Sequence, residues 1–188
     1  MPEFALWRLD ERLVAARDLL EGAGYSEENP LRFTLDYYSG SGVEKIIVFV
    51  KQFWEENLPA EVTINTQEPR AYFARLQQPG EIQCFIALWT GDYRDAAAYL
   101  KLFGSGHSNN FSFFDNDRVD ALLAGGDEIG IVDDKDRYAE IERLLQEQTP
   151  VMPVYYPVHK HLASTELVGY EPNPMNVRMS QFFARAPR

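Results

Sequence analysis

The alternation of helix-like and strand-like apolar patterns constrains this sequence more than any other feature. Residues 9–23 carry apolar side chains at spacings of three and four, which is the pattern of one face of an amphipathic helix, and Gly24 is the expected left-handed stop after it. Residues 31–38 and 61–66 alternate apolar with polar side chains, as strands with one solvated face do. Between these strands, Ser41 and Glu44 predict a capping box that opens a second helix. This order predicts an α/β fold with a mixed, largely parallel sheet flanked by helices.

A further strand is predicted at residues 82–89, because nearly every side chain there is apolar. We expect this strand to be covered on both faces at the centre of the sheet, with Cys84 buried and unreactive inside it. Pro69 suits the first turn of the preceding helix, and a short helix is predicted near residues 96–103. The length of 188 residues suits a single domain.

The second half of the chain predicts two more helices and a late strand. Asp115 or Asn116 is expected to cap the first helix, and Asp133 the second. Residues 151–158 have the composition of a strand, but the two prolines within them confine it to a sheet edge or a bulge.

The charge balance excludes whole classes of partner. The chain has 29 acidic and 18 basic side chains and a formal net charge of −11, so its surface repels nucleic-acid phosphates and anionic lipid. No stretch approaches the roughly 20 apolar residues of a membrane span. The start of the sequence lacks the basic and apolar regions of a signal peptide, so the chain is either cytoplasmic or the body of a longer exported protein.

Motifs of catalysis and metal binding are missing from the sequence. It contains no G-x-S-x-G, HExxH or C-x-x-C pattern, so we predict no catalytic residue and no cofactor. His159 and His161 would point the same way from a strand, but no third metal ligand is predicted nearby. Residues 115–126 lack the glycine and glutamate of a calcium loop, so no metal site is predicted.

One segment has the residues of a ligand site. The predicted strand at 82–89 ends in Trp89 and is followed by Gly91, Asp92 and Tyr93. In open α/β sheets, ligands sit at the carboxyl ends of strands. An aromatic face beside a fixed carboxylate suits a ligand with an apolar body and an ammonium group. A capped turn with core aromatics remains the alternative.

Several segments, in order, resemble motifs of the family-5 extracellular solute-binding proteins, the oligopeptide-binding family. Each motif is weak singly, but together they are collinear over roughly residues 10–172. The matching segments are the "A-x-x-L-L-x-x-A-G-Y" helix at residues 15–25, the strand at 30–38, the "W-x-x-N-L" helix end at 50–58, the "G-W-x-x-D-Y" element at 87–93, the "S-x-N" loop at 108–111, "P-x-x-P-V-Y-Y" at 150–156 and the tail at 168–170.

The resemblance implies a binding protein that captures a peptide between two lobes and delivers it to an importer. It implies that Asp92 holds the α-amino group of the peptide, and that Trp89, in the same element as Tyr93, lines a side-chain pocket. Two further pairs match positions near the ligand: Asn109 and Asn110 in a loop, and Tyr155 and Tyr156 in a strand. We therefore predict that Trp89, Asp92 and one of the two strand tyrosines gather at one edge of the sheet.

The resemblance also bears on domain organisation and partners. Residues 1–188 correspond to a single domain, most of the C-terminal lobe, with 171–188 as the segment that returns to the other lobe. The implied partners are a small peptide, ABC transporter permease subunits and the missing N-terminal lobe, in a periplasmic or extracytoplasmic location, with a membrane-anchored lipoprotein as one form of the full-length protein. The alternatives are a ligand-sensing domain of a transcription regulator, a lobe for a non-peptide solute such as nickel or a sugar, an enzyme, and a fragment without ligand.

Overall fold

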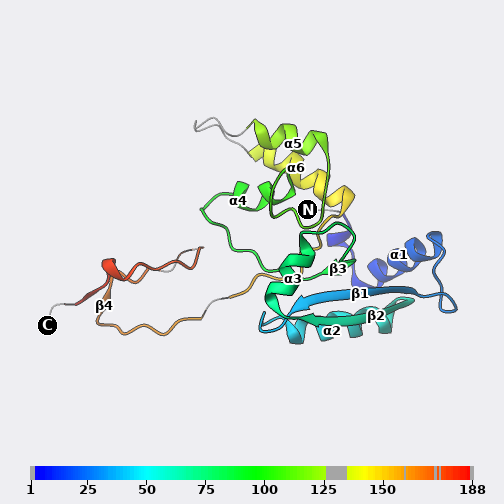
Figure 1. Ribbon diagram of the computed structural model, residues 1–188, viewed down its shortest axis with the longest axis horizontal. Helices are drawn as coiled ribbons and strands as arrows, with labels where there is room; N and C mark the ends of the chain where they lie inside the picture. The colour runs from blue at the N-terminus through cyan, green and yellow to red at the C-terminus, as the bar shows by residue number, and fades with distance from the viewer. Residues whose placement is uncertain (1–2, 126–134, 159, 172, 174, 187–188) are drawn as a thin grey trace. The chain divides into compact units, whose positions relative to one another are not determined.

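The structure is a computed structural model that describes residues 3–125, 135–158, 160–171, 173 and 175–186 (Figure 1). Its internal contacts divide the chain into two compact units, Met1–Leu88 and Trp89–Arg188. In the part of the chain that the structure describes, no helix has the length and apolar character needed to cross a membrane.

The first unit alternates helices and strands as the sequence predicts. A parallel sheet in the order β2-β1-β3 forms its centre. Strands β1 and β2 pair over eight residues, from Leu31 opposite Ala60 to Tyr38 opposite Gln67. The elements are η1 (Glu3–Leu6), α1 (Leu9–Gly22), β1 (Leu31–Tyr38), α2 (Glu44–Asn57), β2 (Ala60–Gln67), α3 (Pro69–Leu76) and β3 (Cys84–Phe85). The predicted α/β class with a largely parallel sheet is confirmed.

The two faces of β1 differ in chemistry because successive side chains of a strand point to opposite sides. Leu35 packs with Val43, Ile47 and Val62 in an apolar core beside α2. The next residue, Asp36, is 2% exposed, and its carboxylate accepts hydrogen bonds from Asn65, Gln67 and Arg75. A buried charge needs such partners to offset its desolvation.

The start of α2 differs from the prediction. Val43, not Ser41, is the N-cap, and no side chain caps the helix. The Ser41 hydroxyl is buried and has no hydrogen-bond partner among the described residues. Val43 is 1% exposed, so burial of its side chain in the core fixes where the helix begins. The predicted stop of α1 is confirmed, since Gly24 has a φ of +88°.

Strand β3 is shorter and less covered than predicted. It comprises Cys84–Phe85 alone and lies at the end of the strand order, so β1 is the central strand of the described sheet. Cys84 and Phe85 are half-buried, and Leu88 is 41% exposed. The prediction of a long central strand with a fully buried cysteine was wrong, because no described strand pairs with the other side of β3.

The second unit is built around a pair of helices. Asn116 caps the first of them by accepting hydrogen bonds from Arg118 N and Val119 N, as predicted. Arg118 also binds Glu140 through two hydrogen bonds of 2.9 and 3.0 Å. The predicted cap Asp133 lies outside the described residues. The elements are α4 (Ala97–Leu100), η2 (Lys101–Phe103), α5 (Asp117–Ala124), α6 (Lys135–Gln148), β4 (Leu167–Val168), η3 (Ser180–Phe182) and β5 (Ala184–Arg185).

The predicted strand at residues 151–158 does not form. These residues are exposed and belong to no strand, and none of them makes a backbone hydrogen bond to a described residue. A strand exists only through its hydrogen-bonded neighbour, and the prolines at 153 and 157 remove two donors. Beyond this segment, β4 pairs with β5 in an antiparallel ladder.

Candidate functional site

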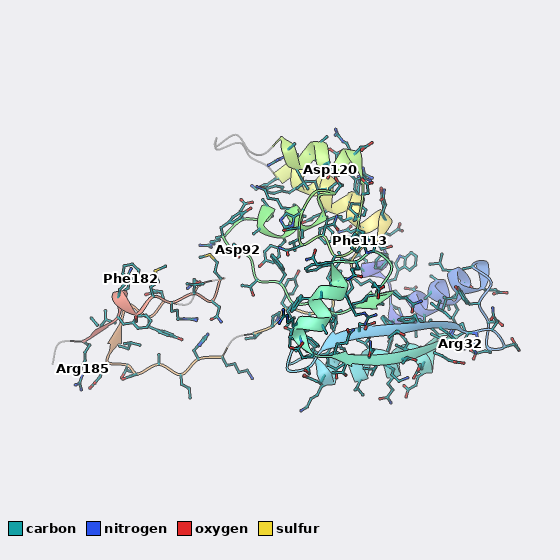
Figure 2. The ribbon with its side chains drawn as sticks, in the orientation of Figure 1. Arg32, Asp92, Phe113, Asp120, Phe182 and Arg185 are labelled. Atoms are coloured by element: carbon teal, nitrogen blue, oxygen red, sulfur yellow. The ribbon has the colours of Figure 1, made fainter. Side chains whose placement is uncertain are left out.

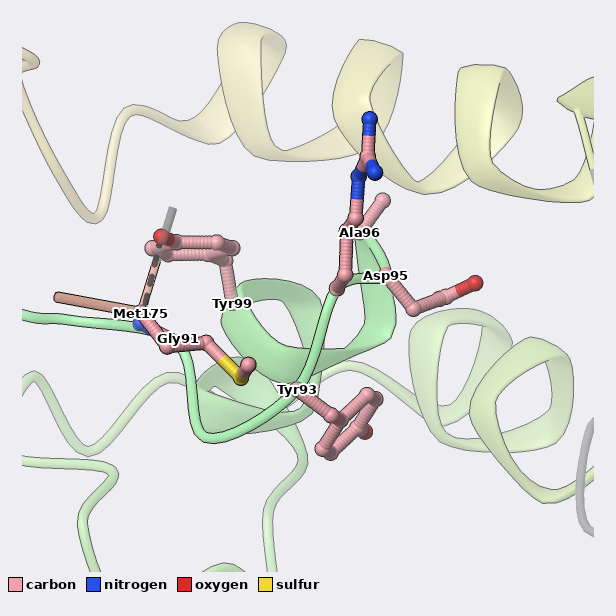
Figure 3. A pocket seen from close by; sticks show the side chains of 7 residues that line it. Gly91, Tyr93, Asp95, Ala96, Tyr99 and Met175 are labelled. Atoms are coloured by element: carbon pink, nitrogen blue, oxygen red, sulfur yellow. Dashed lines mark hydrogen bonds between the residues drawn. The ribbon is translucent and has the colours of Figure 1, made fainter. Parts of the chain in front are cut away.

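The loop that carries Trp89, Asp92 and Tyr93 is held against α4. The indole N–H of Trp89 donates to the carbonyl oxygen of Ala98 at 3.2 Å. The backbone N–H of Gly91 donates to the hydroxyl oxygen of Tyr99 at 3.1 Å, as Figure 3 shows. Both contacts run from the loop to consecutive residues of one helix, so the first half of the loop has a defined position on it.

The other end of the loop is held by Asp95. Its Oδ1 accepts a hydrogen bond from Ala97 N at 2.8 Å and another from the Tyr138 hydroxyl at 2.7 Å. The hydrogen bond from Ala97 N–H lowers the pKa of the Asp95 carboxyl most, and the hydrogen bond from the Tyr138 hydroxyl lowers it further. Both bonds stabilise the charged form of the carboxyl. Asp95 therefore joins the start of α4 to α6.

Asp92, labelled in Figure 2, lies on the loop between these two attachments. Asp92 is exposed and makes no hydrogen bond or ion pair with any described residue. Tyr93 is 44% exposed and Trp89 38%. A carboxylate with no partner in the described part of the chain, close in sequence to two exposed aromatic rings, is available to a cationic group of a ligand.

A cavity of about 300 Å³ lies beside this loop (Figure 3). Its volume is at the lower end of the roughly 300–1,000 Å³ typical of small-molecule sites. Tyr93 and Tyr99 supply aromatic surface, and Arg94 and Asp95 supply charge of opposite sign. The lining residues are Gly91, Tyr93, Arg94, Asp95, Ala96, Tyr99 and Met175.

The two asparagines of the second candidate loop play different parts. Asn110 is 7% exposed. Its Nδ2 donates to the carbonyls of Gly104 and Phe114 at 3.1 and 2.7 Å, and its Oδ1 accepts from Ser112 Oγ and Phe114 N at 2.9 and 3.2 Å. Its amide is thus occupied in shaping the loop. The side chain of Asn109 is half-buried and makes no such bond among the described residues.

The two candidate tyrosines lie in the extended segment 151–158. Tyr155 is 38% exposed and Tyr156 is 92% exposed. Neither makes a hydrogen bond or ring contact with a described residue. Their predicted grouping with Trp89 and Asp92 stays a prediction.

The described residues contain no group of three or more His, Cys, Asp or Glu side chains that could hold a metal ion. Of the two histidines considered as ligands, His159 lies outside the described residues. The other, His161, packs its ring edge-on against Tyr170, with ring centroids 6.0 Å apart.

Sequence reasoning missed the residues that support the loop. Asp95 before Ala96 and Ala97 has the pattern of a helix cap and could have been recognised. Tyr99 and Tyr138 carry no such signal, because only the folded chain brings them to Gly91 and Asp95.

A comparison with protein-family models found no match. Individual proteins do match. The periplasmic murein peptide-binding protein MppA of Escherichia coli is 33% identical over 174 residues, which cover 92% of this chain and 32% of MppA. The periplasmic oligopeptide-binding protein OppA of Salmonella typhimurium is 30% identical over 172 residues, or 90% of this chain and 31% of OppA.

The solved structure of the Escherichia coli murein tripeptide binding protein MppA superposes with a TM-score of 0.86 at 30% identity, covering 100% of this chain and 37% of that one. A third relative, the probable deoxycholate-binding periplasmic protein YgiS of Escherichia coli, is 30% identical over 149 residues, or 79% of this chain and 28% of its own length. The chain belongs to the family of extracellular solute-binding proteins that includes the periplasmic oligopeptide-binding proteins. It spans about a third of the length of the relatives it matches, and these relatives are binding proteins by name.

Proposed function

We propose that this chain forms part of one lobe of a two-lobed periplasmic protein that binds a short peptide for an ABC importer. The remaining partners are the permease subunits of that importer and the other two thirds of the binding protein, which the relatives contain. The chain has no catalytic role in this proposal. The relatives named above are periplasmic binding proteins, which favours import over transcription regulation or catalysis.

The observation that carries the proposal is the exposed carboxylate of Asp92. It stands on a loop attached to α4 on both sides, and it has no partner among the described residues. A carboxylate in this state can accept the hydrogen bonds of the α-ammonium group of a peptide. Trp89 and Tyr93 beside it offer apolar surface to the first side chains of the peptide.

Enclosure by a second lobe decides how strongly this contact binds. On this chain alone Asp92 is exposed, and an ion pair in water contributes only about 0–1 kcal/mol. Removing one partner of an enclosed, hydrogen-bonded charge pair costs about 2–5 kcal/mol. We therefore expect weak or undetectable binding by the 188-residue chain. We expect tight binding by the complete protein, meaning this chain together with the other lobe.

The test is a calorimetric titration of both forms with di- to pentapeptides. Each peptide is used with a free and with an acetylated amino terminus. Asp92→Asn in the complete protein is expected to weaken the free-amine peptides and not the acetylated ones. Asp18→Asn, an exposed position in α1, is the control for the change in net charge. Tight binding by the isolated chain would show that a second lobe is unnecessary, and an unaffected Asp92→Asn would remove the amine anchor from the proposal.

One relative supports a second solute class. YgiS is named as a probable deoxycholate-binding protein, and the exposed rings of Trp89 and Tyr93 are also suited to an apolar body. Deoxycholate lacks an amine, so its binding would not depend on Asp92. Binding of deoxycholate and of no peptide, unchanged in Asp92→Asn, would favour this second class.

A further inference from the structure

We propose that Tyr99 is a positioning residue, which holds the backbone of the binding loop so that Asp92 is presented to the amine of the ligand. This inference rests on the proposed function, because it concerns the same site. In this inference Tyr99 affects the affinity for the ligand indirectly. It contacts the loop that carries Asp92 and does not contact the ammonium group of the ligand.

The contact between Tyr99 and Gly91 has two components. The Gly91 N–H donates to the Tyr99 hydroxyl oxygen at 3.1 Å (Figure 3). The ring also lies directly against the Gly91 backbone. A Cβ atom built on Gly91 would stand 3.0 Å from Cε2 and 3.2 Å from Cζ of Tyr99, and 3.2 Å from Cβ of Ala98. Gly91 is buried in this contact, whereas Asp92, the next residue, is exposed.

Tyr99 can hold the loop because its own helix is anchored in the core of the second unit. The neighbours of Tyr99 in α4, Ala98 and Leu100, are 8% and 6% exposed. Leu100 packs with Val119 and Ile141 of the α5–α6 pair. The Tyr99 contact therefore ties the Gly91 end of the loop to a packed core.

The Asp92 side chain is not fixed by any contact of its own with a described residue. It makes no hydrogen bond or ion pair with such a residue, so its position depends on the backbone on either side. A loop ordered before the ligand arrives avoids the entropy cost of ordering it during binding. The Tyr99 contact is immediately before Asp92 in the chain, and so restricts the peptide unit that joins Gly91 to Asp92.

The test is Tyr99→Phe in the complete protein, which keeps the ring and removes the hydroxyl. One hydrogen bond corresponds to about a two- to tenfold change in an equilibrium constant. We expect that much loss of affinity for free-amine peptides, and unchanged affinity for acetylated ones. A residue that merely stabilised the fold would weaken both kinds of peptide together. The amide of Gly91 should also exchange with solvent faster in the variant, which can be followed in the 188-residue chain.

Gly91→Ala is the second variant, because the added methyl group would stand 3.0 Å from the Tyr99 ring and 3.2 Å from Ala98 Cβ, so the ring or the loop backbone has to shift. It should cause the same selective loss. Tyr25→Phe is the matched control, since the Tyr25 hydroxyl makes no hydrogen bond with a described residue. If Asp92→Asn removes the preference for a free amine and Tyr99→Phe leaves it intact, the positioning role is overturned and the amine anchor stands. If Asp92→Asn itself has no effect, both are overturned.

Discussion

Replacing Asn110 with alanine should destabilise the chain and leave ligand contacts untouched. The side chain is 7% exposed and makes four hydrogen bonds within its loop, two of them to the backbone N–H and C=O of Phe114. Phe114 is itself 9% exposed and belongs to the core of the second unit. Truncation therefore leaves two backbone groups without partners where water has little access.

The magnitude follows from those two groups. Each buried polar group without a partner costs about 1–3 kcal/mol, so the loss of partners for two groups in Asn110→Ala should lower the free energy of unfolding by about 2–6 kcal/mol. Asn109→Ala is the matched control in the same loop. Its side chain makes no hydrogen bond with a described residue, so we expect a change within about 0.5 kcal/mol, as is usual at such positions.

Urea denaturation followed by circular dichroism measures both variants, and peptide titration of the complete protein follows. Stability equal to that of the wild type in Asn110→Ala, together with weakened peptide binding, would refute the reasoning. That result would mean that the Asn110 amide serves the ligand directly and not the loop.

Three further predictions concern titration, reactivity and strand pairing. The pKa of Asp95 is lowered in the folded state. The Asp95 carboxylate therefore contributes its full stabilisation above the pKa it has in the unfolded chain, and this stabilisation is lost as the pH falls through the pKa it has in the folded chain. Thermal unfolding below about pH 4 should thus depend less on pH in Asp95→Asn than in the wild type, and equal slopes would contradict this. Burial raises the pKa of the Cys84 thiol, and the nearby Asp36 carboxylate raises it further. A thiol reagent should therefore react slowly with the native protein at pH 8 and faster in urea. Rapid labelling of the native protein would contradict this prediction. The amides of residues 151–158 should exchange freely in the isolated chain, because they lack hydrogen bonds to described residues. Strong protection of these amides in the isolated chain would contradict this.

The local elements of this protein follow from the sequence because each depends on neighbours in the chain. The period of apolar residues predicted β1 at its exact bounds, Leu31–Tyr38. Asn116 as a cap and Gly24 as a helix stop depend on the conformations of single residues, and both are present. The family resemblance, carried by short motifs in order, is borne out by relatives that cover about nine tenths of the chain.

Tertiary structure decided what depends on partners distant in the chain. A run of apolar residues predicts burial but does not show whether a neighbouring strand will supply hydrogen bonds. For this reason β3 comprises only Cys84–Phe85, and residues 151–158 form no strand. Ser41 and Glu44 had the spacing of a capping box, but packing of Val43 into the core set the helix start. The sequence pointed to Asp92 as a candidate anchor. Only the fold shows that the Tyr99 hydroxyl accepts a hydrogen bond from Gly91 and that the Tyr138 hydroxyl donates one to Asp95. The side chains that hold a loop are those that the folded core places beside it.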